Sequence, residues 1–244
     1  MGKTIAVVSG KGGVGKSTIT AYLALYLGRR GHTVCVLDGD NGMRSLDILL
    51  KVENKVVYDL SDVAEEICPL KRALVKTDYD NVSLLSANAS SDAVTLSDMR
   101  RIVEKMKQSF DYVLIDAPAG TGAGFRNAVA GAETVIAVTT ADAVAVRDAE
   151  RVTGLLKKQG IADIRLILNR QTRRIEKAKG PLAPDEIAHR VDISLLGRIP
   201  DDRKIVSDDA PSVKGAAAKA LERIAARLDG EAVPIPDRVA PLFG

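Results

Sequence analysis

The 244-residue sequence predicts a doubly wound α/β fold, with a mostly parallel sheet and helices on both faces. Short apolar runs alternate along the chain with segments of helical periodicity, as in βαβ units with right-handed crossovers. The runs are apolar throughout, which is typical of strands covered on both faces. Carboxylates directly follow two of the runs, at the strand ends where such sheets bind ligands.

The expected strands are seven apolar runs. They cover residues 4–8, 33–37, 82–85, 112–115, 134–138, 164–168 and 193–196. Helices are expected between them, because apolar side chains recur there at helical spacing. The helical stripes are Ile19, Tyr22, Leu23, Tyr26 and Leu27; Met99, Ile102, Val103 and Met106; Ala145, Ala149, Val152 and Leu156; and Val213, Ala217, Leu221, Ile224 and Leu228. We predict one domain over residues 1–229 and a tail over residues 230–244, where three prolines oppose a continuous helix.

Composition limits the classes of function. Hydrophobic residues are 46%, charged residues 27% and the net charge +3, which is ordinary for a soluble protein and does not demand a polyanionic partner. Aromatic residues are only 3%, which argues against a base-stacking surface for single-stranded nucleic acid. No run reaches the roughly 18 residues of a membrane span. Because residues 4–8 already form an expected strand, we expect no signal peptide and a cytoplasmic location.

The cysteines and histidines give no sign of a metal or catalytic site. Cys35 and Cys68 form no C-x-x-C motif, and Cys35 lies inside an apolar run. We therefore expect Cys35 to be a small core residue. His32 follows an expected turn and His189 stands beside an arginine, so neither is assigned a role in chemistry.

A phosphate-binding loop follows the first run. Residues 10–17 satisfy G-x-x-x-x-G-K-[ST] between an expected strand and an expected helix. Its glycines let backbone N–H groups converge on phosphate oxygens, and the helix N-terminus adds partial positive charge. Lys16 is expected to reach the β- and γ-phosphates, and Ser17 to bind Mg²⁺. The nucleotide-binding residues expected here are Gly10, Lys11, Gly12, Gly13, Val14, Gly15, Lys16, Ser17 and Thr18.

Carboxylates at two strand ends complete the expected site. Asp38 and Asp40 follow the run 33–37, and Asp116 follows the run 112–115. Asp116 suits the second Mg²⁺ position, directly or through water, and Asp38 is grouped with it as a metal ligand. Asp40 is the better candidate for positioning an attacking water. The alternative for each is an ordinary turn or helix-cap residue.

Lys11 has no obvious target in its own chain, and a solvated lysine is the simplest interpretation. However, the sequence KGGVGKST with this extra lysine resembles the deviant phosphate-loop motif of the MinD/ParA class of ATPases. The resemblance implies ATP and Mg²⁺ as ligands and an ATP-bridged homodimer as the active state. It also implies that Lys11 reaches the partner's nucleotide across the dimer interface, and that Lys11, Lys16 and Asp40 carry catalysis.

The resemblance covers most of the chain. Residues 38–47 match D-x-D-x-G-x-R-x-L-D, residues 116–120 match D-x-P-A-G and residues 146–151 match V-R-D-x-x-R, and together they favour the MinD branch over the ParA branch. Two segments resemble adenine contacts. They imply that Asn169 bonds the base, that Pro200 and Asp201 lie along its edge, and that Arg170 belongs to the nucleotide site. For Asn169 the alternative is a strand-end turn residue.

The function that the resemblance implies is a slow, partner-stimulated ATP hydrolase. It would act as a spatial switch, most closely in placing the cell-division site. Two alternatives share the same ATPase domain: a ParA-like ATPase that partitions DNA or other cargo, and a flagellar-number regulator. A metabolic phosphate-loop enzyme, a redox protein and a non-hydrolysing sensor are further alternatives. The activating protein and the cargo are not identified by the sequence.

Two segments bear on the surface where the protein works. The tail holds one basic residue, Arg238, and ends near Leu242 and Phe243, so it is expected to bind lipid poorly unless two tails pair in a dimer. Peripheral binding to the inner face of the cell membrane is therefore left open. Residues 165–179 hold six Lys or Arg residues against one acid. They form a solvated loop, a patch for a partner protein or acidic lipid, or a non-specific DNA surface.

Overall fold

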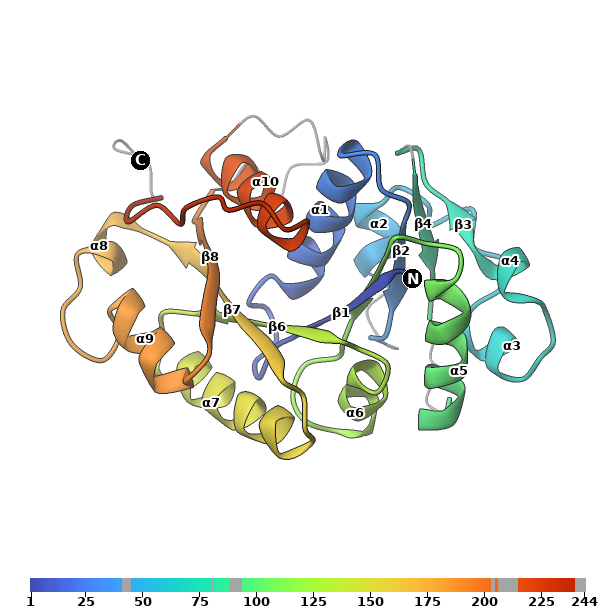
Figure 1. Ribbon diagram of the computed structural model, residues 1–244, viewed down its shortest axis with the longest axis horizontal. Coiled ribbons are helices and arrows are strands. Elements are labelled where there is room, and N and C mark those ends of the chain that lie inside the picture. The colour runs from blue at the N-terminus through green and yellow to red at the C-terminus, as the bar shows by residue number, and fades with distance from the viewer. Residues whose placement is uncertain (41–44, 80, 88–93, 203–204, 206–214, 240–244) are drawn as a thin grey trace.

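The structure, a computed structural model, describes residues 1–40, 45–79, 81–87, 94–202, 205 and 215–239. Within these residues, eight strands form one sheet (Figure 1). They are β1 (Lys3–Val8), β2 (Val34–Asp38), β3 (Val75–Lys76), β4 (Val82–Leu85), β5 (Tyr112–Asp116), β6 (Thr134–Thr140), β7 (Asp163–Gln171) and β8 (Ser194–Pro200). Their order across the sheet is β3-β4-β2-β5-β1-β6-β7-β8, and every neighbouring pair is parallel except β3 with β4.

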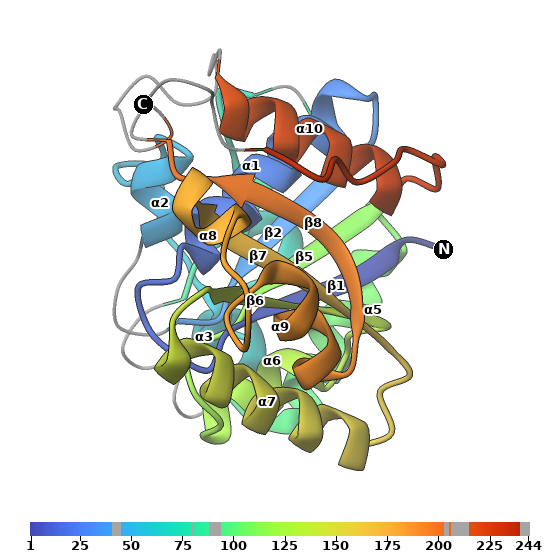
Figure 2. The same ribbon diagram turned by 90° about the vertical axis from the view of Figure 1, so that its left-hand side faces the viewer.

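Helices cover both faces of this sheet (Figures 1 and 2). They are α1 (Lys16–Arg29), α2 (Ser45–Leu49), α3 (Leu60–Ala64), α4 (Leu70–Ala73), α5 (Leu96–Lys107), α6 (Ala123–Val129), α7 (Ala143–Lys158), α8 (Arg173–Glu176), α9 (Pro184–Val191) and α10 (Ala216–Leu228). The longer ones begin at side-chain caps where the sequence supplies them. Thr95 caps α5 in a capping box with Asp98, and Asp142 caps α7 through the backbone N–H of Ala145.

The core lies in two main layers, one on each face of the sheet. Successive side chains of a strand point to opposite faces, so Ile5 and Val7 of β1 join a cluster with α1, α2 and α10. Ala6 and Val8 join a second cluster with α3, α5, α6 and α7. A smaller third cluster packs α7 and α9 on β7. This two-sided burial explains why the strands are apolar throughout.

The predicted fold class is confirmed, and each of the seven predicted runs overlaps a strand. The short antiparallel strand β3 was not predicted, because only two residues pair at this sheet edge. The last helical stripe begins at Val213, which lies outside the described residues, and α10 begins at Ala216. No helix in the described ranges is long and apolar enough to cross a membrane.

The topology places the phosphate loop at the centre of the sheet. β1 lies between β5 and β6, so the loop that leads from β1 into α1 opens where the strand order changes direction. The carboxyl ends of β2 and β5 lie beside it, because both strands run parallel to β1. This switch point is where doubly wound sheets bind their ligands.

Candidate functional site

The phosphate loop wraps around an open cavity at the N-terminus of α1. Gly13 and Gly15 adopt positive φ angles of 76° and 93°, which glycine tolerates without strain. A Cβ on Gly10 would lie 2.5 Å from the carbonyl oxygen of Asp148, so this end of the loop is pressed against α7. The adjoining space, which we call the loop cavity, has a volume of about 550 Å³. It is lined by Ser9, Gly12, Gly13, Gly15, Lys16, Ser17, Thr18, Asp40, Ser45, Leu49, Pro118, Ala119 and Arg170.

Lys16 and Asp116 form a buried ion pair beside this cavity. The Lys16 Nζ lies 2.8 Å from Asp116 Oδ1, with 7% and 1% of the two side chains exposed. The hydroxyl of Thr20 donates to the same carboxylate oxygen at 3.1 Å. Thr20 was not singled out from the sequence, although its place four residues after Lys16 puts both on one face of α1. The loop lysine is therefore held by the carboxylate at the end of β5.

Asp38 lies next to Asp116 on the neighbouring strand, paired in register. Its Oδ1 accepts a hydrogen bond from the backbone N–H of Asp40 at 3.0 Å. Burial raises the pKa of Asp38 to about 7, and the nearby Asp116 adds to this shift. Burial also raises the pKa of Asp116, although Lys16 opposes the shift. Two carboxyl groups this close together in a buried site favour either a bound cation or a retained proton.

The donor set fits Mg²⁺. Within the described part of the chain, Asp38 Oδ2 and Asp116 Oδ2 are buried and accept no hydrogen bond. Buried carboxylate oxygens are normally satisfied, so these two atoms point to a missing positive partner. Mg²⁺ takes oxygen ligands, one or two carboxylates among them, and keeps several waters. The Ser17 hydroxyl lies 3.4 Å from the Lys16 Nζ that pairs with Asp116, so all three predicted metal ligands lie in one region.

Asp40 lines the loop cavity and lies two residues after the end of β2. It is partly exposed, unlike Asp38, so its carboxylate is open to the cavity and to water. This is the placement that a water-orienting carboxylate needs. Residues 41–44 of the matched motif lie outside the described residues.

Lys11 behaves differently from Lys16. It does not line the loop cavity, and its Nζ lies 3.4 Å from Asp142 Oδ1, with 45% of each side chain exposed. Asp142 also caps α7 and accepts a hydrogen bond from the Thr140 hydroxyl. Asp142 was not predicted from the sequence to lie near the site. An exposed ion pair of this kind contributes little stability. Lys11 is thus held loosely at the rim, away from the phosphate side of its own loop.

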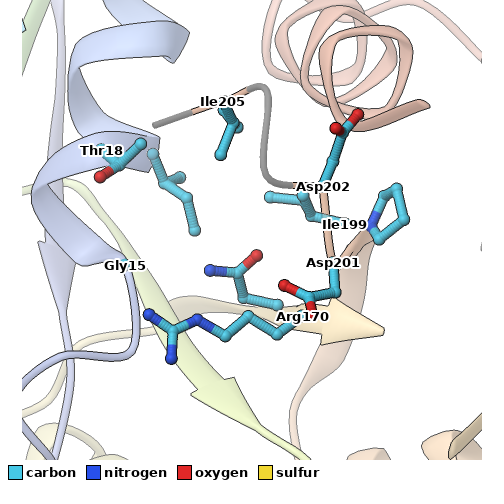
Figure 3. Close-up of a pocket in the computed structure, with 10 residues that line it drawn as sticks. Gly15, Thr18, Arg170, Ile199, Asp201, Asp202 and Ile205 are labelled. Carbon is cyan, nitrogen blue, oxygen red and sulfur yellow. The ribbon is translucent and has the colours of Figure 1, made fainter. Parts of the chain in front are cut away.

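A second cavity of about 250 Å³ opens beside the loop cavity (Figure 3). We call it the base cavity, because the predicted adenine contacts Asn169, Pro200 and Asp201 line it. Asn169 is fixed there by donating from Nδ2 to the carbonyl of Val14 at 2.7 Å, which ties β7 to the phosphate loop. The remaining lining residues are Gly15, Thr18, Ile19, Arg170, Ile199, Asp202 and Ile205.

The apolar part of the base cavity was missed from the sequence. Ile19, Ile199 and Ile205 supply it, and they come from α1, β8 and the segment after β8. Side chains from distant parts of the chain carry no local signal that they share a cavity. The apolar wall and the polar edge of Asn169 and Asp201 together suit a heterocyclic base, which has apolar faces and a polar edge.

Comparison with known proteins agrees with this geometry. A ParA family model, described as NUBPL iron-transfer P-loop NTPase, matches residues 1–229. The septum site-determining protein MinD of Synechocystis sp. is 42% identical over 253 residues, covering 98% of this chain and 94% of that protein.

Two solved structures are similar over nearly the whole chain. In the MinC:MinD cell division protein complex of Aquifex aeolicus, the matching chain has a TM-score of 0.89 at 34% identity, covering 98% of this chain and all of that one. The MinD of Pyrococcus horikoshii, complexed with Mg-ADP, has a TM-score of 0.83 at 31% identity, covering 94% of this chain and 97% of that one.

Proposed function

Because the chain belongs to the ParA family of P-loop NTPases and, within it, to the MinD group, we propose that it is a nucleotide-controlled switch for placing the cell-division site. Mg-ATP joins two copies face to face, and hydrolysis separates them. The dimer presents the working surface to a regulator protein and to the membrane. The chain is an ATPase, as its family is.

The placement of Lys11 carries the dimer proposal. A phosphate loop normally turns its cations toward its own ligand, yet Lys11 lies outside the loop cavity and makes only an exposed contact with Asp142. Releasing Lys11 from this contact costs little, because both side chains are 45% exposed. Lys11 is then free to add its charge to the nucleotide of a second subunit, as an arginine finger does in other NTPases.

Within one subunit, the residues divide the remaining work. Lys16 leaves Asp116 for the β- and γ-phosphates, and Asp38, Asp116 and Ser17 hold Mg²⁺ directly or through its waters. The metal ion neutralises charge on the phosphates when it is bound. Asp40 orients a water at the open side of the loop cavity and can accept its proton.

The division-site role follows from the MinD relatives. The Aquifex aeolicus MinD is seen with MinC, so a regulator protein of that kind is a natural partner for this chain.

The tail is the segment that bears on membrane contact, and its described part, residues 230–239, is held against the domain by arginine side chains. Arg227 donates to the carbonyls of Val233 and Pro234, and Arg198 donates to the carbonyl of Asp237. The predicted apolar end, with Leu242 and Phe243, lies outside the described residues.

A ParA-like role on DNA is the second candidate, and α8 is the observation that favours it. Arg173, Arg174, Lys177 and Lys179 are exposed in and just after α8. Such a cluster can neutralise phosphates of a DNA backbone without reading sequence.

Iron transfer, which the description of the family model mentions, has less support. Cys35 and Cys68 are both buried, at 0% and 4% exposure, and Cys35 is confirmed as a core residue. A cluster bridging two subunits needs cysteines at the surface.

Sedimentation velocity tests the dimer. The wild type should dimerise with Mg-ATP and remain monomeric with ADP, whereas K11A should stay monomeric with both. K55A is the matched control, because Lys55 is also an exposed lysine in a surface ion pair, with Asp78. A K11A protein that dimerises as the wild type does would contradict the proposal.

Co-sedimentation identifies the working surface. The protein is pelleted with anionic liposomes or with DNA, each in ATP and in ADP. ATP-dependent pelleting with liposomes supports the division-site proposal, and pelleting with DNA alone replaces it with partitioning. Septum position, scored after deletion of the gene in its host, tests the cellular role. Septa that stay in their normal position would contradict it.

A further inference from the structure

Arg170 stands in an unusual backbone conformation at the end of β7. Its φ is +54°, in the left-handed region that only glycine adopts without strain. The pairing of β7 with β8 shifts register between Leu168 and Gln171, so the strand is irregular at this point. Strained residues of this kind persist when the surrounding structure holds them, and they gather at ligand sites.

The irregularity changes where the Arg170 side chain points. In a regular strand, neighbouring residues face opposite sides of the sheet, so Arg170 would lie on the face of Leu168, which packs against α7 and α9. Instead, Asn169 and Arg170 line the same cavity, although they are consecutive. Figure 3 shows the Arg170 side chain extending from the end of β7 toward the loop at Gly15. The irregularity at the end of β7 therefore directs the Arg170 guanidinium toward the nucleotide site instead of the face of Leu168.

Arg170 lies where the two cavities meet. Three residues line both the loop cavity and the base cavity: Gly15, Thr18 and Arg170. A nucleotide with its base against Asn169 and its terminal phosphates in the loop must place its ribose and α-phosphate at this junction. Of the three shared residues, only Arg170 carries a charge. Its side chain is exposed and makes no hydrogen bond or ion pair within the ranges that the structure describes.

We propose that Arg170 is a clasp over the middle of the nucleotide, with its guanidinium bound to the α-phosphate. The inference rests on the proposed function, because it assigns a role within the same ATP site. A guanidinium presents a planar fork of donors that matches phosphate oxygens, whereas Lys16 acts on the far phosphates as a point charge. Arg170 therefore serves ATP and ADP alike, and it holds the nucleotide in the monomer after hydrolysis.

The test separates strain from binding. R170G removes the guanidinium and relieves the left-handed backbone, so its melting temperature without nucleotide should stay the same or rise. Its affinities for ATP and for ADP, measured by calorimetry with Mg²⁺, should both fall about 10- to 100-fold, the range for a lost hydrogen bond to a charged group. R170K keeps the backbone and the charge but loses the fork, and should lose affinity several-fold.

K51G is the matched control. Lys51 is also an exposed cation with a left-handed φ of 56°, and it lines neither cavity. K51G should match R170G in melting temperature and match the wild type in affinity.

Equal nucleotide affinities for wild type, R170G and R170K would contradict the proposal. A loss of affinity for ATP but not for ADP would contradict it too, because Arg170 would then contact the γ-phosphate. A wild-type protein that binds neither ATP nor ADP would instead refute the proposed function.

Discussion

Replacing Asp116 by Ala should destabilise the protein by about 4 kcal/mol in the absence of nucleotide and metal. The magnitude follows from burial. The two charges of the Lys16–Asp116 pair lie 2.8 Å apart with 7% and 1% of the side chains exposed, so D116A leaves a buried ammonium without its counter-charge. Breaking a buried pair in this way costs about 3–5 kcal/mol. The hydroxyl of Thr20 loses an acceptor in the same substitution.

A double-mutant cycle isolates the pair. K16M alone leaves the Asp116 carboxylate without its cation, and K16M/D116A leaves neither charge behind. The double variant should therefore lose about 2–3 kcal/mol less than the sum of the single variants. D78A is the control, because the Lys55–Asp78 pair is as short, at 2.6 Å, but 47% and 65% exposed. Its cost should stay below about 1 kcal/mol.

Urea unfolding near neutral pH with a chelator measures all four variants against the wild type. The midpoints should shift while the slopes stay constant, which indicates a change in stability rather than in the denatured state. Equal losses for D116A and D78A would refute the reasoning, because burial would then not decide the strength of the pair. Full additivity of K16M and D116A would refute it as well.

Three further predictions test other parts of the structure. G15A should lower the unfolding free energy by about 2–3 kcal/mol in thermal melts, because φ is 93° and the new Cβ would lie 2.5 Å from Nδ2 of Asn169. A G15A protein as stable as the wild type would contradict the close approach. Asp229 Oδ1 lies 2.7 Å from Nε2 of His32, and Asp229 Oδ2 accepts hydrogen bonds from Arg30. These two contacts, that with His32 above all, lower the pKa of Asp229 to about 2. A carboxylate with a lowered pKa stabilises the fold at pH values above its unfolded pKa of 3.8, and this stabilisation is lost as the pH falls toward 2. D229N should therefore have a free energy of unfolding about 1 kcal/mol below that of the wild type at neutral pH, after allowing for solvent screening. In urea titrations, this difference should disappear as the pH approaches 2. In D38A, ADP alone should still raise the melting temperature, but Mg²⁺ should no longer add a further rise to the ADP complex. If Mg²⁺ stabilises the ADP complex of D38A as much as that of the wild type, Asp38 is not a metal ligand.

The fold could be predicted largely because its strands are buried on both faces. Such strands leave continuous apolar runs that need no tertiary information to be found, as at β1 and β5. The ends of strands were less predictable. β7 runs three residues beyond the predicted run, because Asn169, Arg170 and Gln171 are polar. The burial of Asn169 and Gln171 depends on contacts with the phosphate loop and with β8, which the local sequence does not show. The two-residue strand β3 is too short to leave a periodic pattern.

The phosphate loop, the acids after the strands and the alternation of strand and helix are local patterns, so the sequence alone determined the fold class and the class of ligand. Distances between remote side chains are not local, and only the folded chain decided them. It paired Lys16 with Asp116, turned Lys11 toward Asp142 outside the loop cavity, and aimed Arg170 at the junction of the two cavities. The physical reason is that packing between distant segments sets a side chain's partner, and Lys11 and Asp142 are 131 residues apart. Single backbone angles, such as the φ of Arg170, also decide where a side chain points. Neither is encoded in the periodicity of the chain.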